Sequence, residues 1–85
     1  MMEVVSGSQG TYVVNDTTEY TGVFDAIVVL EDTLFSSIKI AGVDSKSDYI
    51  STPGTAVKAG AMIRPQNGVA FSGVQLTSGS VILVL

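Results

Sequence analysis

Residues 22–40 read GVFDAIVVLEDTLFSSIKI, and the fold class can be inferred from this stretch. Its centre, residues 26–30, is a continuous apolar run that ends at the acidic pair Glu31-Asp32. Over residues 33–40, apolar and polar side chains mostly alternate, as they do in a strand with one buried face. Both patterns predict short β-strands, and the first pattern predicts a strand that is covered on both of its faces.

The whole chain has the residue mix of a β protein. Among its 85 residues are 13 Val, 6 Ile and 8 Thr, whose β-branched side chains favour strands. Nine Gly and two Pro divide the chain at short intervals. We therefore predict an all-β fold, a small β-sandwich or jelly-roll-like domain of several short antiparallel strands. The predicted strands are residues 11–14, 20–24, 26–30, 33–40, 57–64, 69–76 and 80–85. We expect a break or turn at Gly60 within 57–64 and an interruption at Gly73 within 69–76.

A chain of this length is expected to form a single β domain, here residues 1–85. Residues 1–10, which end in Gly7-Ser8-Gln9-Gly10, are predicted to form a flexible N-terminal arm. The clearest turn is Asn67-Gly68, because both residues tolerate the positive φ that a type I′ hairpin turn requires. Residues 43–51 are polar and are predicted to form a loop.

The composition excludes several kinds of function. With no Cys and no His, the chain cannot form a disulfide, a thiolate or imidazole zinc site, or a Ser–His or Cys–His catalytic pair. Its four cations are scattered in a chain of net charge -4, so we expect no nucleic-acid partner. No apolar run reaches the roughly 20 residues of a membrane helix, so we expect no membrane partner. No secretory signal is visible, and we expect synthesis in a cytoplasm.

The acidic residues are the remaining candidates for chemistry. Glu31-Asp32, together with Asp25, Asp44 and Asp48, could supply oxygen ligands to calcium, but their spacing matches no EF-hand loop. The same pair could act as acid and base in glycoside cleavage, but that reaction needs an aromatic-lined cleft, and the chain has no Trp. A turn at the end of a strand, facing water, is the simpler interpretation. We therefore expect no catalytic residue, no metal site, no cofactor and no enzymatic activity.

Two predicted strands are apolar on both faces, residues 26–30 and the C-terminal run VILVL, residues 81–85. A small sandwich has few elements with which to cover a second face, and small domains without disulfides often gain stability by oligomerising. We expect a homo-oligomer with part of one of these strands at the interface. The alternative is two central strands covered by loops of the same chain. The interface candidates are Ile27, Val29, Val81, Ile82, Leu83 and Leu85.

Residues 24–38 carry a motif of the form F-x-x-I-x-V-L-x-D-x-x-F-x-S-I/L, made up here of Phe24, Ile27, Val29, Leu30, Asp32, Phe35, Ser37 and Ile38. This motif resembles one found in small virion proteins encoded in the head-gene regions of tailed bacteriophages. The glycine-rich end of that group has counterparts in Gly60-Ala61-Met62-Ile63 and in residues 76–82, LTSGSVI. One departure is the C-terminal Val84-Leu85, where the group more often ends with an aromatic or polar residue.

The resemblance implies a capsid decoration (cement) or head-fibre protein that works as a homo-oligomer, commonly a trimer. Its partners would be copies of itself and the major capsid protein, and its location the capsid surface of the virion. The alternative is a small carbohydrate- or receptor-binding module at a fibre tip. The candidate residues for that alternative are Tyr12, Tyr20 and Tyr49 with Asp48, because exposed aromatic rings beside a carboxylate suit a glycan.

Overall fold

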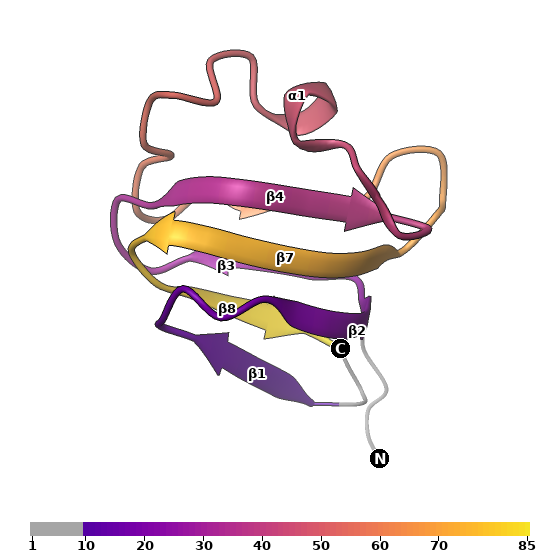
Figure 1. Cartoon of the computed structure of the whole chain (residues 1–85). Helices are drawn as coiled ribbons and strands as arrows, with labels where there is room; N and C mark the ends of the chain where they lie inside the picture. The colour runs from indigo at the N-terminus through magenta and orange to yellow at the C-terminus, as the bar shows by residue number, and fades with distance from the viewer. Residues whose placement is uncertain (1–9) are drawn as a thin grey trace.

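The computed structural model describes residues 10–85, which form two antiparallel sheets of four strands each (Figure 1). The first, which we call sheet A, has the strand order β1-β8-β3-β6, and the second, sheet B, has the order β2-β7-β4-β5. The elements are β1 (Thr11–Val14), β2 (Tyr20–Phe24), β3 (Ala26–Val29), β4 (Leu34–Ile40), β5 (Val43–Asp44), α1 (Lys46–Tyr49), β6 (Met62–Ile63), β7 (Phe71–Ser78) and β8 (Val81–Val84). The prediction of a small all-β sandwich is confirmed.

The chain passes from one sheet to the other at almost every connection. Only β4 and β5 follow one another within the same sheet, so most strand pairs join segments that are distant in the sequence. β8 lies between β1 and β3 and pairs Val81 with Val14 on one side and with Val29 on the other. The two strands predicted to be apolar on both faces, β3 and β8, are therefore neighbours at the centre of sheet A.

The core lies between the inner faces of the two sheets. Five of the six aromatic residues form a continuous chain of ring contacts, with centroid distances from 4.9 to 5.8 Å, a spacing at which aromatic pairs attract. This chain runs from Tyr12 through Tyr20, Phe24 and Phe71 to Tyr49. The aliphatic part of the core comprises Val14, Ile27, Val29, Ile38, Val74, Leu76, Val81 and Leu83.

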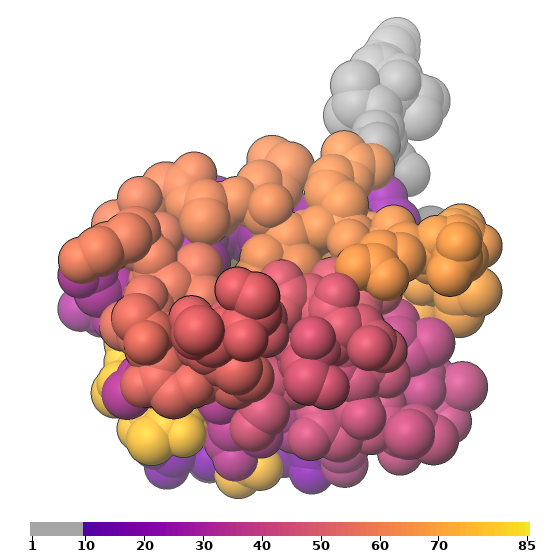
Figure 2. Space-filling view, turned by 90° about the horizontal axis from the view of Figure 1, so that it is seen from above, coloured from indigo at the N-terminus to yellow at the C-terminus, as the bar shows by residue number. Residues whose placement is uncertain are grey.

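The two sides of the sandwich are closed by the chain itself. At one side, Tyr12 of sheet A meets Tyr20 of sheet B. At the other side, residues 45–61, which include α1, pass above β4 on their way to sheet A (Figure 1), and Figure 2 looks down on this segment. It is tied to the sandwich by Val57, whose N–H donates to the carbonyl oxygen of Thr33 at 2.7 Å.

The turn at Asn67-Gly68 has the predicted conformation but a different role. Asn67 and Gly68 have φ of 58° and 72°, and the N–H of Val69 donates to the carbonyl oxygen of Gln66 at 3.3 Å, which closes the turn. Both central residues thus have the positive φ of a type I′ turn. The predicted hairpin is nevertheless wrong, because this turn leads from β6 in sheet A to β7 in sheet B.

Two other segments can be compared with prediction. Within residues 57–64, the chain turns at Gly60 with φ of 91°, as predicted, and the strand that follows the turn is β6. The loop expected over residues 43–51 contains β5 and the single turn of α1. The predicted N-terminal arm, residues 1–10, lies outside the described residues except for Gly10, whose carbonyl oxygen accepts the N–H of Leu85 at 2.9 Å.

Gly79 makes the turn that joins β7 of sheet B to β8 of sheet A. Its φ is 97°, and a Cβ added there would overlap Oγ1 of Thr33 and lie 2.8 Å from the carbonyl oxygen of Asp32. Thr33 is fully buried; its hydroxyl donates to the carbonyl oxygen of Glu31 at 2.7 Å and accepts the N–H of Ser80 at 3.2 Å. At position 79, in the connection between β7 and β8, there is therefore room only for glycine.

Candidate assembly surface

The outer face of sheet A carries a row of apolar side chains that crosses all four strands. Strand pairing places Val13 opposite Ile82, Ile82 opposite Val28, and Val28 opposite Met62. Directly opposite residues of antiparallel strands share one face of a sheet. This row points away from the core, because the adjacent residue Ile27 is fully buried and successive side chains alternate between faces.

Further apolar residues flank this row. Val84 and Ala26 form the next pair beside the row, and Leu30 lies two residues after Val28 on the same side of the chain. Three side chains of this surface are about half exposed, at 51% for Val13, 45% for Leu30 and 57% for Met62. With the partly exposed Val28, Ile82 and Val84 they present roughly 300–450 Å² of apolar surface, which is the size of the largest apolar patch on a typical monomer, a patch that often has a function. The name apolar face is used below for seven residues, of which Ala26 is buried and the others are partly or half exposed; these are Val13, Ala26, Val28, Leu30, Met62, Ile82 and Val84.

Polar groups border the apolar face. At one corner, Nη2 of Arg64 lies 3.6 Å from Oδ2 of Asp25. At the opposite end, the hydroxyl of Ser80 donates to Oε2 of Glu31 at 2.8 Å. None of the seven residues of the apolar face is charged. An apolar centre with a polar rim is the usual anatomy of a protein–protein interface.

The outer face of sheet B is polar instead. Nζ of Lys39 and Oε2 of Glu19 form an ion pair at 2.6 Å above Gly73 of β7. Beside it, the side chain of Gln75 donates to the carbonyl oxygen of Thr17 at 3.0 Å. These groups bond to one another and to water, so this face is stable without a partner. The difference between the two faces makes the apolar face of sheet A the candidate assembly surface.

In the folded chain, four of the six predicted interface residues face the core. Ile82 belongs to the apolar face, and Leu85 is partly exposed at the edge of the core. The other four candidates are at most 1% exposed, because they pack between the chain's own two sheets and leave no surface for a partner; these are Ile27, Val29, Val81 and Leu83.

Sequence reasoning missed six residues of the apolar face. In strands β3 and β8 every position is apolar, so the sequence contains no signal that separates the inward-facing residues from the outward-facing ones. Val13 and Met62 lie on the edge strands β1 and β6, and they join the surface only through pairing with β8 and β3.

The acidic residues considered as metal ligands make separate local contacts. The carboxylate of Asp32 accepts the N–H of Ala59 at 3.1 Å and lies 3.4 Å from Nζ of Lys58. The hydrogen bond from Ala59, followed by the bond and positive charge of Lys58, lowers the pKa of Asp32 below its usual value. Asp44 accepts two backbone N–H groups. Within residues 10–85, no three side chains of the kinds that bind metals come together.

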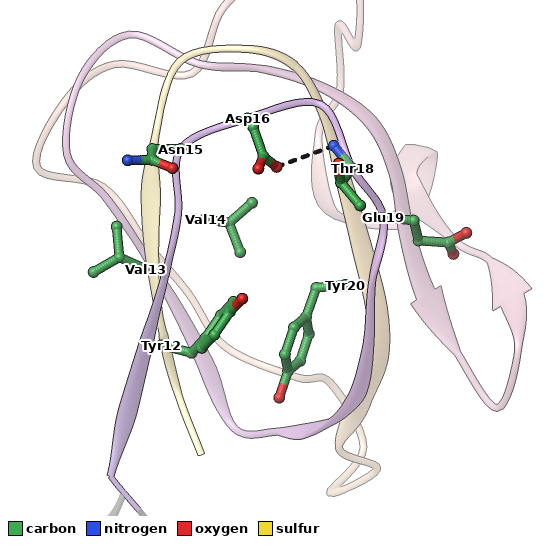
Figure 3. A pocket seen from close by; sticks show the side chains of 8 residues that line it. All are labelled: Tyr12, Val13, Val14, Asn15, Asp16, Thr18, Glu19 and Tyr20. Atoms are coloured by element: carbon green, nitrogen blue, oxygen red, sulfur yellow. Dashed lines mark hydrogen bonds between the residues drawn. The ribbon is translucent and has the colours of Figure 1, made fainter.

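Two of the three tyrosines considered for glycan binding lie together. Tyr12 and Tyr20 border a hollow of about 170 Å³ at the corner between β1 and β2. In Figure 3 their rings and the carboxylate of Asp16 surround this hollow, whereas the side chain of Glu19 points away. Oδ1 of Asp16 accepts the N–H of Thr18 at 3.1 Å.

The third tyrosine and its neighbouring acid lie elsewhere. Tyr49 and Asp48 border a separate hollow of about 140 Å³ near the Asn67-Gly68 turn. The hydroxyl oxygen of Tyr49 accepts the N–H of Gln66 at 3.0 Å, and the side chain of Gln66 donates to the carbonyl oxygen of Asp48 at 2.9 Å. The predicted glycan-binding group is therefore divided between two places, and Tyr49 serves to anchor a loop.

Comparison with known proteins finds no match to this chain among protein families, curated proteins or solved structures. In the described part of the chain, no helix has the length and apolar character needed to cross a membrane.

Proposed function

We propose that this chain is a structural virion protein of a tailed phage that decorates or cements the capsid surface as a homo-oligomer. The observation that carries the proposal is the uncharged apolar face on the outside of sheet A. Such a surface suits a protein partner. The motif in residues 24–38 resembles one found in small phage head proteins, and this resemblance is the reason for proposing a capsid role. The partners would be copies of this chain and the major capsid protein.

A protein of this kind acts by binding rather than by catalysis. Bridging neighbouring capsid subunits would oppose the outward pressure of packaged DNA. Each contact can be modest, because the binding of linked copies is multiplied by their high effective concentration. The apolar face provides such a modest contact, since a standard interface buries about 800 Å² per partner.

Virions of the phage that encodes this chain provide the test. We expect the chain to be present in many copies per particle by quantitative mass spectrometry. We also expect density for the β-sandwich on the outer capsid surface in an electron-microscopy map. Absence of the chain from purified virions, or its confinement to a few copies in the tail, would contradict the proposal.

Reconstitution gives a matched control. Heads that lack the chain should lose DNA at a lower temperature than complete heads, and the purified wild-type chain should restore their stability. Val23→Lys should restore it equally, because Val23 is 75% exposed on β2, in the other sheet. Ile82→Lys, within the apolar face, should restore it poorly.

A second candidate function is binding of a host glycan, and the hollow that Tyr12 and Tyr20 border favours it. Aromatic rings beside a carboxylate, here that of Asp16, offer apolar contact and hydrogen bonds to a sugar. A glycan array should then show selective binding that Tyr12→Ala weakens about tenfold while Tyr49→Phe leaves it unchanged. An array without any bound glycan would rule this function out.

A further inference from the structure

We propose that the partner of the apolar face is the same face of a second copy of this chain, related to the first by a two-fold axis. This inference rests on the proposed function, in that it names the first partner of the same surface. It adds the identity of that partner and the symmetry of the contact.

Charge is the first argument for a second copy. Each chain carries a net charge of -4, so two copies repel unless their acids stay apart. The apolar face is uncharged, and the charges on its rim lie at opposite ends: Asp25 with Arg64, a pair of mixed sign, at one end, and the carboxylate of Glu31 at the other. A contact through sheet B would instead bring together two copies of the Glu19–Lys39 pair and would require removing these charges from water.

Area is the second argument. Two apolar faces packed together would bury roughly 600–900 Å² of apolar surface, and their rims would bring the total toward the lower end of stable protein interfaces. Interfaces at this lower end of the size range belong to weak, reversible assemblies, so we expect a dimer that dissociates on dilution. It also leaves the sides of the sandwich, including the segment of residues 45–61, accessible to the capsid protein.

Shape is the third argument, and it favours two-fold symmetry over the trimer that the resemblance implies. A two-fold contact uses one patch on both subunits, whereas a closed trimer needs two different patches that fit each other. The apolar face is one continuous patch. The other highly exposed valines of the described strands, Val23 and Val43, are single residues on β2 and β5 of sheet B.

The molar mass in solution tests the dimer. We expect analytical ultracentrifugation of the wild-type chain to show a monomer–dimer equilibrium in the micromolar range. Ile82→Lys and Val13→Lys should each raise the dissociation constant roughly tenfold or more, because they place like charges at the contact. Both should keep the wild-type circular dichroism spectrum. The matched control Val23→Lys should leave the dissociation constant unchanged.

Cross-linking tests the symmetry. The chain has no Cys, so Ile82→Cys would introduce a single thiol near the middle of the row. Packed sheets lie about 10 Å apart, so a bis-maleimide of about that reach should join two copies through this residue. Val23→Cys should not cross-link above background at the same concentration.

The outcomes separate this inference from the proposed function. A wild-type chain that is monomeric at all accessible concentrations, or trimeric, would overturn the two-fold dimer. If that chain is still found in many copies on virions, its role on the capsid stands and the apolar face has another occupant, such as the capsid protein, although a monomeric chain would contradict the homo-oligomer. A two-fold dimer that is absent from virions would support the inference and contradict the proposed function.

Discussion

The outer faces of the two sheets differ in polarity, although the inner face of each sheet covers the same core. Each sheet covers the core on its inner side, but only sheet B has a polar outer side, where Lys39 pairs with Glu19. On the outer face of sheet A, by contrast, the apolar side chains of Val13, Leu30 and Met62 are about half exposed. A polar outer face can remain in contact with water without a partner, whereas an apolar outer face gains stability when another molecule covers it.

A single chain can enclose the core even though the outer face of sheet A is exposed. The sides of the sandwich are closed by Tyr12 and Tyr20 on one flank and by residues 45–61 on the other. The apolar face contributes little to the core, because the side chains that fill the core belong to the opposite side of the same strands. Substitutions on the two sides of one strand should therefore have different effects.

The largest effect is expected at Leu83, the inner neighbour of Ile82 on β8. Leu83→Lys buries a charge in the core and should cost about 4 kcal/mol or more, a large share of the stability of a small domain. Loss of the cooperative thermal transition is the expected readout. Ile82→Lys should retain the transition. If both variants unfold alike, the assignment of Ile82 to an outer face is wrong.

A smaller but still large effect is expected at the connection between the sheets. Gly79→Ala should lower the free energy of unfolding by about 3 kcal/mol, since the added Cβ overlaps Thr33 and φ is positive. Gly68→Ala is the matched control: Gly68 also has a positive φ but no atom within 4 Å of an added Cβ, so it should cost only about 1 kcal/mol. Equal costs in urea unfolding would show that crowding at Gly79 is unimportant.

On the polar face of sheet B, the expected effect is smaller. Lys39→Ala removes the ion pair with Glu19 and should cost about 0.5 kcal/mol, as measured by urea unfolding. Lys58→Ala, which removes the more exposed partner of Asp32, should have no measurable effect. A cost at Lys39 as large as that at Gly79 would mean that the polar face is not simply a hydrated surface.

The smallest effect concerns pH and Asp32. Because the pKa of Asp32 is lowered in the folded chain, its carboxylate stabilises the fold at pH values above the pKa of the unfolded chain. That contribution is lost as the pH falls through the lowered pKa. We expect the NMR titration of Asp32 to have its midpoint below the usual value for Asp, and the amide signal of Ala59 to move with it. In Asp32→Asn this titration of the Ala59 amide should disappear.

Some features of the structure followed from local sequence. The β-branched content predicted the fold class, and most strands lie where alternation or apolar runs predicted them. Asn67 and Gly68 have the predicted positive φ, because backbone preferences at such residues are local. Within residues 57–64, the predicted break at Gly60 is the place where the chain turns, and only β6, which follows it, is a strand.

The candidate surface was only partly predictable. The excess of apolar residues in 26–30 and 81–85 correctly indicated that β3 and β8 have two apolar faces, but four of the six residues chosen for the interface face the core. Side chains alternate between faces with a period of two, so a run that is apolar at every position is equally compatible with either orientation. For this reason the predicted interface included both Ile82, which faces outward, and its neighbour Leu83, which faces the core.

Residue composition and local patterns were enough to establish that this chain is a β protein, where most of its strands and turns lie, and that two strands carry more apolar surface than one face of a sandwich requires. Which side of those strands faces the core was settled by the folded arrangement alone. That choice depends on pairing between distant segments, such as β8 with β1 and β3, and on the packing of sheet A against sheet B. Local sequence patterns contain the period of the alternation, but the contacts between distant segments set its phase.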